Sequence, residues 1–295
     1  MAKKGLIFDI QRQCIHDGDG VRTVLFVKGC PLRCKWCANP ESQSMEREIA
    51  VLPQRCIGDG NCIQACPNVA IKRPAQIDRS KCIRCGKCAE VCYPGALSVF
   101  GRWIDSDAVS EKLLKDKPFF SRGGGITISG GEPFGQAEFV KDILYRLHVE
   151  GIHTAVETCG YARAEDLLAA KVDQFLFDIK LMDEEKHLYW VGVSNRLILK
   201  NLRLLSEAGR RITLRMPMIP GVNDDEDNIR EVVDLMHRLN ICEFHILPFH
   251  QLGMSKYQMI DKAYALKEKL TPTTQEVRRI VELFQHSGVQ PIVGG

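Results

Sequence analysis

The sequence predicts an α/β protein: a partial, TIM-like barrel of six β/α units, interrupted by a small cysteine-rich insertion. Three observations support this prediction. Short apolar runs alternate with amphipathic stretches from about residue 105 onward. Glycines and polar residues recur where the predicted strands end. Seven of the 13 cysteines crowd into residues 56–92. Alternating strands and helices indicate parallel pairing through right-handed crossovers, and an open doubly wound sheet is the alternative.

The predicted elements follow in order along the chain. The first strand, 21–27, is rich in β-branched residues and follows a glycine. Five further strands are expected at 125–129, 152–156, 174–179, 211–216 and 243–248, with a last one at 289–293. Helices are expected at 107–117, 137–150, 164–170, 195–208, 225–239 and 274–286. We therefore expect one barrel built from 1–46 and 100–295, with 47–99 as an inserted domain.

Composition narrows the class of protein. A hydrophobic content of 45% is enough for a full core, and a net charge of +3 favours neither nucleic acid nor a membrane surface as a partner. No apolar run reaches the length of a membrane span, and the first five residues lack the apolar stretch of a signal peptide. We expect a cytoplasmic protein, where thiols stay reduced, so 13 cysteines indicate metal or redox chemistry.

Three cysteines follow the first strand within one short loop. Cys30, Cys34 and Cys37 have gaps of three and two residues, with Trp36 before the last. A cuboidal iron–sulfur cluster normally takes four thiolates, so three would leave one iron with an open position for chemistry. A zinc site or three unrelated core cysteines is the alternative, although structural zinc prefers four protein ligands.

The insertion carries a bacterial ferredoxin spacing. Its second half has gaps of two, two and three residues, and the fourth cysteine of such a run ligates the other cluster. One complete 4Fe-4S cluster is therefore predicted on four cysteines: Cys66, Cys82, Cys85 and Cys88. A second cluster is predicted on the remaining three: Cys56, Cys62 and Cys92. Zinc is the alternative for the whole region.

Asp59 occupies the position where the frame calls for a cysteine. A carboxylate binds iron more weakly than a thiolate, so the second cluster could be Asp-ligated or become a three-iron, 3Fe-4S species. In the other interpretation Asp59 only forms a turn between two glycines. Both remain open. The other cysteines, Cys14, Cys159 and Cys242, receive no role.

Polar residues follow each predicted strand of the barrel. The carboxyl ends of parallel strands meet at one mouth, where barrel chemistry resides. The residues expected there are Ser129, Gly130, Gly131, Glu132, Glu157, Thr158, Asp178, Ile179, Lys180, Arg215 and His250. Carboxylates, a lysine and close-approach glycines suit a zwitterionic, amino-acid-like cofactor that chelates the open iron.

These residues resemble those of the radical S-adenosylmethionine (SAM) superfamily. The stretch from Asp17 to Glu41 looks like that of the glycyl radical enzyme activating enzymes, with Asp19 where that family usually has proline. The insertion resembles the two-cluster ferredoxin-like domain of many members. The resemblance covers nearly the whole chain.

The resemblance implies a role for each matching residue. Cys30, Cys34 and Cys37 would hold a 4Fe-4S cluster whose fourth iron binds SAM. Gly130, Gly131 and Glu132 would hold the methionine amine, and Trp36, Cys37 and Ala38 would line the adenine pocket. Further cofactor contacts are implied at Asp178, Ile179, Lys180, Arg215 and His250. Glu157, Thr158 and Asp178 match positions that hold a monovalent cation in relatives.

The implied reaction is a reductive cleavage of SAM, after which a hydrogen atom leaves one glycine of a partner glycyl radical enzyme. Reduced flavodoxin or ferredoxin would donate the electron, and the insertion would relay electrons or dock the partner. Two alternatives remain: a radical SAM enzyme acting on a small molecule or peptide, and a multi-cluster electron-transfer protein.

Overall fold

The computed structural model describes residues 2–120 and 123–294 and has an α/β fold around a mostly parallel sheet. Within these residues the sheet has nine strands, in the order β13-β12-β11-β10-β9-β8-β2-β1-β7. Neighbouring strands from β2 to β13 pair in parallel. They are β2 (Arg22–Val27), β8 (Gly125–Gly130), β9 (His153–Thr158), β10 (Gln174–Asp178), β11 (Ile212–Met218), β12 (Glu243–Pro248) and β13 (Ile292–Val293).

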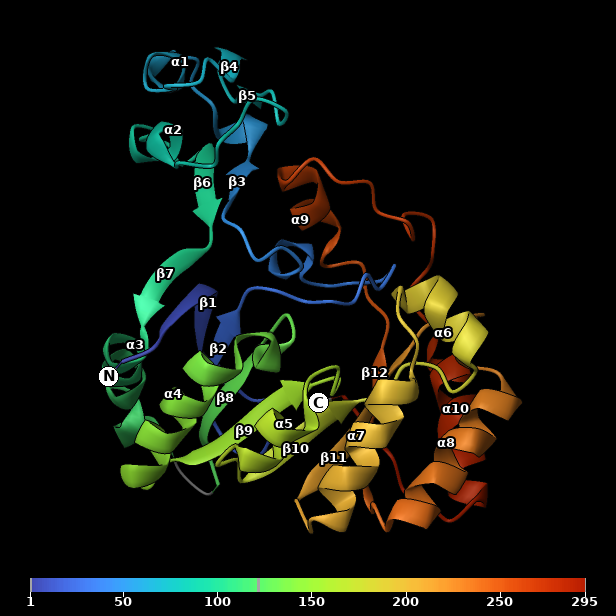
Figure 1. Cartoon of the computed structure of the whole chain (residues 1–295). Helices are drawn as coiled ribbons and strands as arrows, with labels where there is room; N and C mark the ends of the chain where they lie inside the picture. The colour runs from blue at the N-terminus through green and yellow to red at the C-terminus, as the bar shows by residue number, and fades with distance from the viewer. Residues whose placement is uncertain (1, 121–122, 295) are drawn as a thin grey trace.

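Helices connect the parallel strands, as the alternating pattern predicts (Figure 1). The connecting helices are α3 (Ser106–Leu114), α4 (Ala137–Val149), α5 (Ala164–Ala169), α6 (Glu184–Val191), α7 (Arg196–Glu207), α8 (Glu226–Leu239), α9 (Met254–Met259) and α10 (Thr274–His286). The expected helix over 107–117 ends at Leu114, and a 3₁₀ turn η3 (Lys117–Phe119) follows, because Pro118 disfavours α-helix at the residue before it. Helices α6 and α9 were not expected from the sequence.

Two strands of the sheet were not expected. Strand β1 (Lys4–Cys14) pairs antiparallel with β2, and β7 (Arg102–Asp105) pairs antiparallel with β1. Irregular register in β1 interrupts the strict alternation that would have marked it as a strand. Together they extend the sheet beyond its first parallel strand.

The main hydrophobic core lies between one face of the sheet and the helices. Successive strand residues point to opposite faces, and the cluster takes Phe175 and Phe177 from β10 and Leu214 and Met216 from β11. The intervening residues, such as Asp178, face the other side. This alternation places polar side chains together on the face away from the helices.

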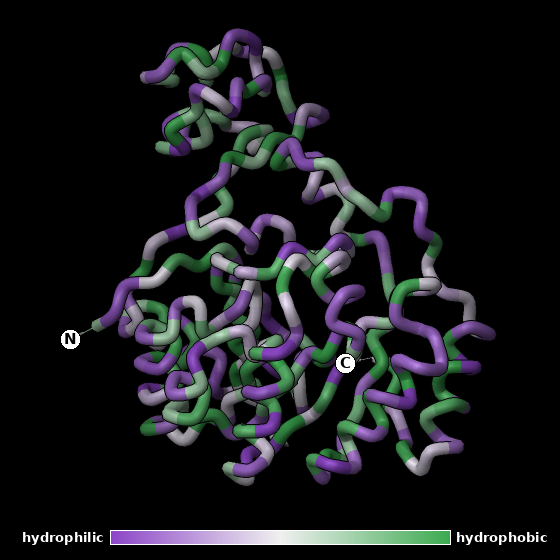
Figure 2. Tube along the Cα trace, turned by 45° about the vertical axis from the view of Figure 1, so that its right-hand side comes forward, coloured by the Kyte–Doolittle hydropathy of each residue, from purple (hydrophilic) through white to green (hydrophobic). Residues whose placement is uncertain are grey.

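The cysteine-rich lobe, residues 48–100, stands apart from the sheet at the top of Figure 1. Its base is an antiparallel pair, and its remaining elements are short. They are β3 (Glu48–Val51), η2 (Pro53–Arg55), α1 (Asn61–Gln64), β4 (Ile71–Arg73), β5 (Gln76–Ile77), α2 (Lys87–Glu90) and β6 (Leu97–Phe100). Figure 2 shows hydrophilic and hydrophobic stretches interspersed over the lobe and over the body of the molecule. None of the described helices is long and apolar enough to cross a membrane.

Candidate functional site

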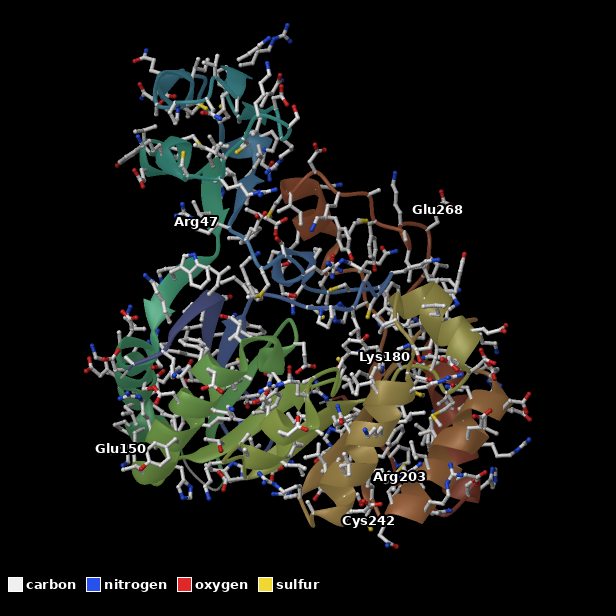
Figure 3. All side chains as sticks on the ribbon, in the orientation of Figure 1. Arg47, Glu150, Lys180, Arg203, Cys242 and Glu268 are labelled. Atoms are coloured by element: carbon white, nitrogen blue, oxygen red, sulfur yellow. The ribbon has the colours of Figure 1, made fainter. Side chains whose placement is uncertain are left out.

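A cavity of about 280 Å³ opens at the carboxyl ends of the parallel strands. Lys180 follows β10 at the carboxyl ends of the strands, and Cys242 precedes β12 at their amino ends. Figure 3 shows these two residues far apart. Fourteen of the residues expected at this mouth line the cavity: Cys30, Cys34, Trp36, Cys37, Ala38, Ser129, Gly130, Gly131, Glu157, Thr158, Asp178, Lys180, Arg215 and His250. The structure therefore brings the three-cysteine loop and the strand-end residues to one place.

Contacts with distant parts of the chain shape the three-cysteine loop. Gly29 has a φ of +97°, which favours glycine, and its amide donates to the Ser42 carbonyl at 2.6 Å. On the other side of the loop the amide of Arg33 donates to the Val191 carbonyl at 2.7 Å. The last turn of α6 thus holds the loop against the sheet.

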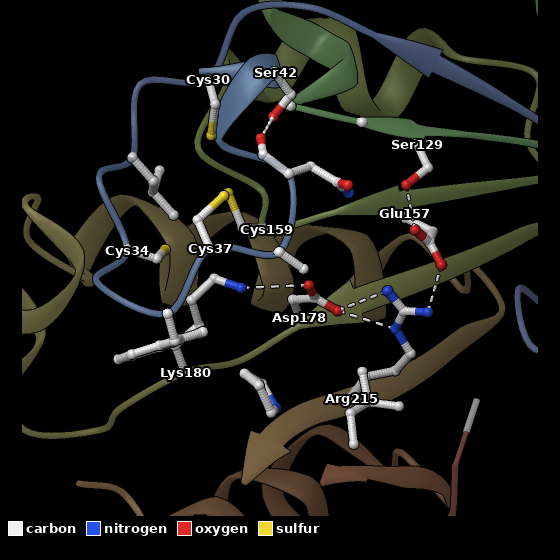
Figure 4. A pocket seen from close by; sticks show the side chains of 18 of the residues that line it. Cys30, Cys34, Cys37, Ser42, Ser129, Glu157, Cys159, Asp178, Lys180 and Arg215 are labelled. Atoms are coloured by element: carbon white, nitrogen blue, oxygen red, sulfur yellow. Dashed lines mark hydrogen bonds and ion pairs between the residues drawn. The ribbon is translucent and has the colours of Figure 1, made fainter. Parts of the chain in front are cut away.

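The three thiols face the cavity from different directions (Figure 4). Burial raises the pKa of the Cys30 and Cys34 thiols to about 12, so they keep their protons unless a metal displaces them. In the described part of the chain, no three His, Cys, Asp or Glu side chains converge as ligands of one metal ion. The three thiols surround a space larger than a single metal ion, and this space suits a cluster of several iron atoms.

An ion-pair network forms one wall of the cavity, as Figure 4 shows. Arg215 lies 2.5 Å from Glu157 and 3.0 Å from Asp178, whose second oxygen lies 3.3 Å from Lys180. Strand register explains this, because Asp178 of β10 pairs with Arg215 of β11. Ser129 donates a hydrogen bond to Glu157. Two carboxylates and two cations make the network neutral.

Ion pairing keeps each side chain of this neutral network ionised. Burial alone would raise the pKa of Asp178, but Arg215 and Lys180 outweigh it and hold that pKa below its usual value. Burial would lower the pKa of Lys180, and Asp178 reverses this effect. The cavity therefore offers a fixed ammonium and a fixed guanidinium to a ligand that carries both signs of charge.

Asp17 adds a further carboxylate beside this network. It lies in the loop before β2, and burial, with the nearby charge of Glu157, raises its pKa to about 6. Asp17 is therefore protonated in part near neutral pH, where two close carboxylates would otherwise repel each other.

Two of the expected contact residues do not line the cavity. Ile179 belongs to the core on the helix side of the sheet, because it follows Asp178 and points to the opposite face. Glu132 is fully buried and its carboxylate accepts hydrogen bonds from the protein. The Thr158 hydroxyl donates to it at 2.7 Å and the Cys159 amide at 3.0 Å. Glu132 thus ties the turn after β8 to the end of β9.

Cys159 lines the cavity, although no role was expected for it from the sequence. Its thiol lies 3.0 Å from a Glu132 oxygen, and burial raises its pKa well above the ordinary value. Cys159 directly follows the strand-end residues Glu157 and Thr158, and this position could have predicted that it lies at the cavity.

The cysteine-rich lobe contains a second, much smaller cavity of about 20 Å³. The four cysteines expected to share one cluster all line it: Cys66, Cys82, Cys85 and Cys88. Its other lining residues, such as Ile49 and Ile71, include none with a charged side chain. Spacing along the chain and proximity in space therefore agree for this group.

The other expected cluster residues of the lobe do not line this small cavity. Cys62 is buried in the lobe's apolar cluster, and Cys56 and Cys92 pack against it. Asp59 is engaged locally, because its two carboxylate oxygens accept from the Asn61 amide at 3.2 Å and from the Asn61 side chain at 2.9 Å. This contact fits the turn interpretation of Asp59.

Comparison with known proteins shows the family. The model of the radical SAM superfamily matches residues 24–234. The trans-4-hydroxy-L-proline dehydratase activating enzyme of Clostridioides difficile is 38% identical, over 98% of this chain and 99% of its own. The isethionate sulfite-lyase activating enzyme of Oleidesulfovibrio alaskensis is 43% identical, over 90% of this chain and 89% of its own.

A solved structure supports the fold alone. Streptococcus suis SuiB, crystallised with its precursor peptide SuiA, has a TM-score of 0.55 at 14% identity and covers 92% of this chain and 48% of its own. The family match and the two relatives together show the group of proteins to which the chain belongs. The chain belongs to the radical SAM superfamily, among its activating enzymes.

Proposed function

We propose that this enzyme generates a glycyl radical in a partner glycyl radical enzyme, using SAM and a 4Fe-4S cluster held by Cys30, Cys34 and Cys37. The observation that carries the proposal is the shared cavity. Three thiols line this cavity, and their own loop holds no fourth cysteine. The charged wall of Glu157, Arg215 and Asp178 lies opposite these thiols. When bound, the cluster and SAM supply reductive cleavage to methionine and a 5′-deoxyadenosyl radical that takes the glycine hydrogen.

The chain's own residues bind and orient the cofactor. Gly130 and Gly131 leave no room for a side chain, since a Cβ would lie 2.3 Å from the Val27 carbonyl and 2.2 Å from the Gly29 carbonyl. Their backbone therefore packs directly against β2 and the start of the three-cysteine loop, at the part of the cavity proposed to take the methionine end. Lys180 and Arg215 act as fixed charges for orientation.

The adenine end of the cofactor is assigned to the opposite wall. Trp36, Cys37 and Ala38 would line this part of the cavity, with His250 nearby. Glu132 supports the methionine side indirectly, through the backbone that it ties together. A monovalent cation on Glu157, Thr158 and Asp178 would compete with Arg215, which already pairs with both carboxylates.

We also propose that the sheet is a partial barrel. The main core lies between the helices and one face of the sheet, and the other face carries the cavity residues. Barrel enzymes place chemistry at the carboxyl ends of their strands, as here. An open barrel edge would admit a loop of a folded partner protein.

The cysteine-rich lobe is proposed as a ferredoxin-like insertion at 47–99 within a barrel of 1–46 and 100–295. The cavity lined by Cys66, Cys82, Cys85 and Cys88 supports one 4Fe-4S cluster. A second iron–sulfur cluster would rest on the three thiols of Cys56, Cys62 and Cys92.

The lobe would relay electrons from reduced flavodoxin or ferredoxin. Replacing Cys85 and Cys88 by alanine tests this hypothesis in a single-turnover reduction of the cluster at Cys30. Slower reduction by the protein donor, with unchanged reduction by dithionite, is expected. Unchanged reduction by both would end the relay hypothesis.

The function is tested with a purified glycyl radical enzyme, and any such protein found encoded next to this chain is the first choice. Electron paramagnetic resonance (EPR) of the anaerobic mixture with SAM and dithionite should show a glycyl radical on that protein. Formation of 5′-deoxyadenosine without a glycyl radical would indicate a small-molecule or peptide substrate instead. Failure to bind SAM would leave the electron-transfer alternative.

A further inference from the structure

A buried charge cluster lies behind the wall of the main cavity. Ala38, Asn39 and Ser42 line the cavity, whereas Glu41, in the same segment, does not. Glu41 is only 1% exposed. A fully buried carboxylate needs partners, so its contacts determine where segment 38–42 lies.

Two lysines converge on Glu41 from different parts of the chain. The Lys28 ammonium donates to the Glu41 backbone carbonyl. The Lys256 ammonium lies 2.7 Å from a carboxylate oxygen of Glu41 and donates to the Asn39 side chain at 2.7 Å. Glu41 is therefore held through its backbone and through its side chain at once.

The network continues into the cysteine-rich lobe. Lys28 is fully buried and lies 3.1 Å from Glu48, the first residue of β3 at the base of the lobe. Glu48 also lies 3.4 Å from Lys262. A buried ammonium left without its carboxylate is strongly destabilised, so Lys28 depends on the lobe for its charge balance.

Helix α9 also contacts both segment 38–42 and the cysteine-rich lobe. Beside its amino end, a Cβ on Gly253 would lie 2.7 Å from the Ala38 carbonyl, so the two backbones are in close contact. At its other end Arg79 of the lobe donates to the Met259 carbonyl at 3.1 Å and also to the Ile49 carbonyl of β3. The cysteine-rich lobe and segment 38–42 are thus joined by α9 and by the ion network around Lys28.

We propose that Glu41 is a positioning residue for bound SAM and that Lys28 extends this support to Glu48, so that the cysteine-rich lobe helps to shape a cavity it does not line. This inference rests on the proposed function, since SAM is the ligand concerned. Moving segment 38–42 would separate the buried Glu41 carboxylate from the Lys256 ammonium and the buried Lys28 ammonium from the Glu41 carbonyl, which is costly at low dielectric. The network therefore holds that segment in one position.

Glu48→Gln tests the inference, with Glu46→Gln as the matched control. Glu46 is two residues away and also pairs with a cationic side chain, that of Arg84, but both side chains are exposed. The full chain, with its clusters reconstituted anaerobically, is titrated with SAM by calorimetry. Glu48→Gln should weaken SAM binding about tenfold, and Glu46→Gln less than about twofold. Iron content should be unchanged in both.

A double-mutant cycle with Glu41→Gln adds a second measure. If both carboxylates act on segment 38–42, the combined loss of affinity should be smaller than the product of the single losses. The EPR change that SAM causes in the reduced cluster should also differ from wild type in Glu48→Gln. A general loss of stability would not produce that change.

Two results would overturn the inference: wild-type SAM affinity with a wild-type EPR change in Glu48→Gln, or equal weakening by Glu46→Gln and Glu48→Gln. Should Glu41→Gln fail to fold, the Glu48 comparison decides alone, because Glu48 is partly exposed. A wild-type protein that does not bind SAM would instead reject the proposed function.

Discussion

The three-cysteine loop and the cysteine-rich lobe differ in how the fold supports their cysteines. Residues more than 100 positions away hold the loop: Gly29 accepts from the Glu132 amide, and Arg33 donates to Val191. In the lobe, support is local, since Cys66 accepts from the Ala70 amide and Cys92 from the Leu97 amide. Local contacts therefore support cysteines of the lobe, whereas the position of the three-cysteine loop depends on the assembled sheet.

The two cavities also differ in charge. Arg215, Lys180, Asp178 and Glu157 line the large cavity, while no charged residue lines the small one. Fixed charges suit a zwitterionic ligand that binds and leaves, and an apolar lining suits a resident cluster shielded from water.

Cys34→Ser should abolish SAM cleavage, because it removes one of only three thiols in the loop. A fall of more than about 100-fold is expected, since residues that merely support a metal ligand already cost about 10- to 100-fold. Quantifying 5′-deoxyadenosine after reduction with dithionite measures the effect. Cys242→Ser is the control, because this exposed thiol lies outside both cavities. Substantial cleavage by Cys34→Ser would contradict the assignment.

Asp178→Asn should weaken both SAM binding and folding, because it leaves Arg215 and Lys180 without their shared carboxylate. We expect a loss of about 2–3 kcal/mol in the free energy of unfolding, somewhat less than for a completely buried pair. Denaturant titration under anaerobic conditions measures it. Glu138→Gln, which removes an exposed ion pair, should leave stability unchanged. Equal effects of the two changes would show that the wall is not an essential network.

Cys88→Ser should remove the complete cluster of the lobe without breaking the Lys28–Glu48 pair at the base of the lobe. The variant should lose about four iron atoms per chain, the content of one cluster. Cleavage of SAM driven by dithionite should stay within about twofold of wild type, because this thiol does not line the large cavity. Iron analysis and product quantification measure the two effects separately. A loss of cleavage as large as that of Cys34→Ser would remove the distinction between the two regions.

Asp59→Cys should complete the second thiolate set of the lobe. Asn61 already occupies both Asp59 oxygens, so we expect wild-type protein to hold a three-iron cluster at this site, with an EPR signal in the oxidised state. The variant should gain about one iron atom per chain and lose that signal. An oxidised wild-type protein without such a signal would show that this interpretation of Asp59 is wrong.

Asp17→Asn should have the smallest effect, visible in the pH dependence of stability. The folded-state pKa of Asp17, about 6, lies above its usual value. Its contribution to stability is therefore fully present below the unfolded-state pKa and declines as pH rises through about 6. Wild type should lose thermal stability between pH 5 and pH 7.5 relative to the variant. Parallel melting curves for the two proteins would contradict this.

Much of the fold could be predicted from sequence because its parallel strands carry near-continuous apolar runs. All six strands expected before the last one form, and the final strand is shorter than expected, at Ile292–Val293. Strand β1 was missed because its register shifts disturb the alternation. Helices α6 and α9 are short, at eight and six residues. Helix α6 contacts the three-cysteine loop and α9 contacts segment 38–42, and no local pattern reveals such contacts.

The cavity-lining residues were predictable because strand ends converge in parallel sheets. Glu132 and Ile179 are the exceptions. Strand alternation turns Ile179 to the core. Two of the donors that enclose Glu132, the Thr158 hydroxyl and the Cys159 amide, come from the end of another strand, β9. Lys28 and Glu41 gave no signal at all, because a buried lysine beside a buried glutamate is recognisable only when both positions are known in space.

The most direct test of the central claim is SAM cleavage by the purified, anaerobically reconstituted chain under dithionite, measured as 5′-deoxyadenosine and methionine. We expect wild type and the Cys85→Ala, Cys88→Ala double variant both to form these products, and Cys30→Ser to form none. Absence of products in wild type, or equal amounts in Cys30→Ser, would contradict the assignment of the chemistry to the three-cysteine loop.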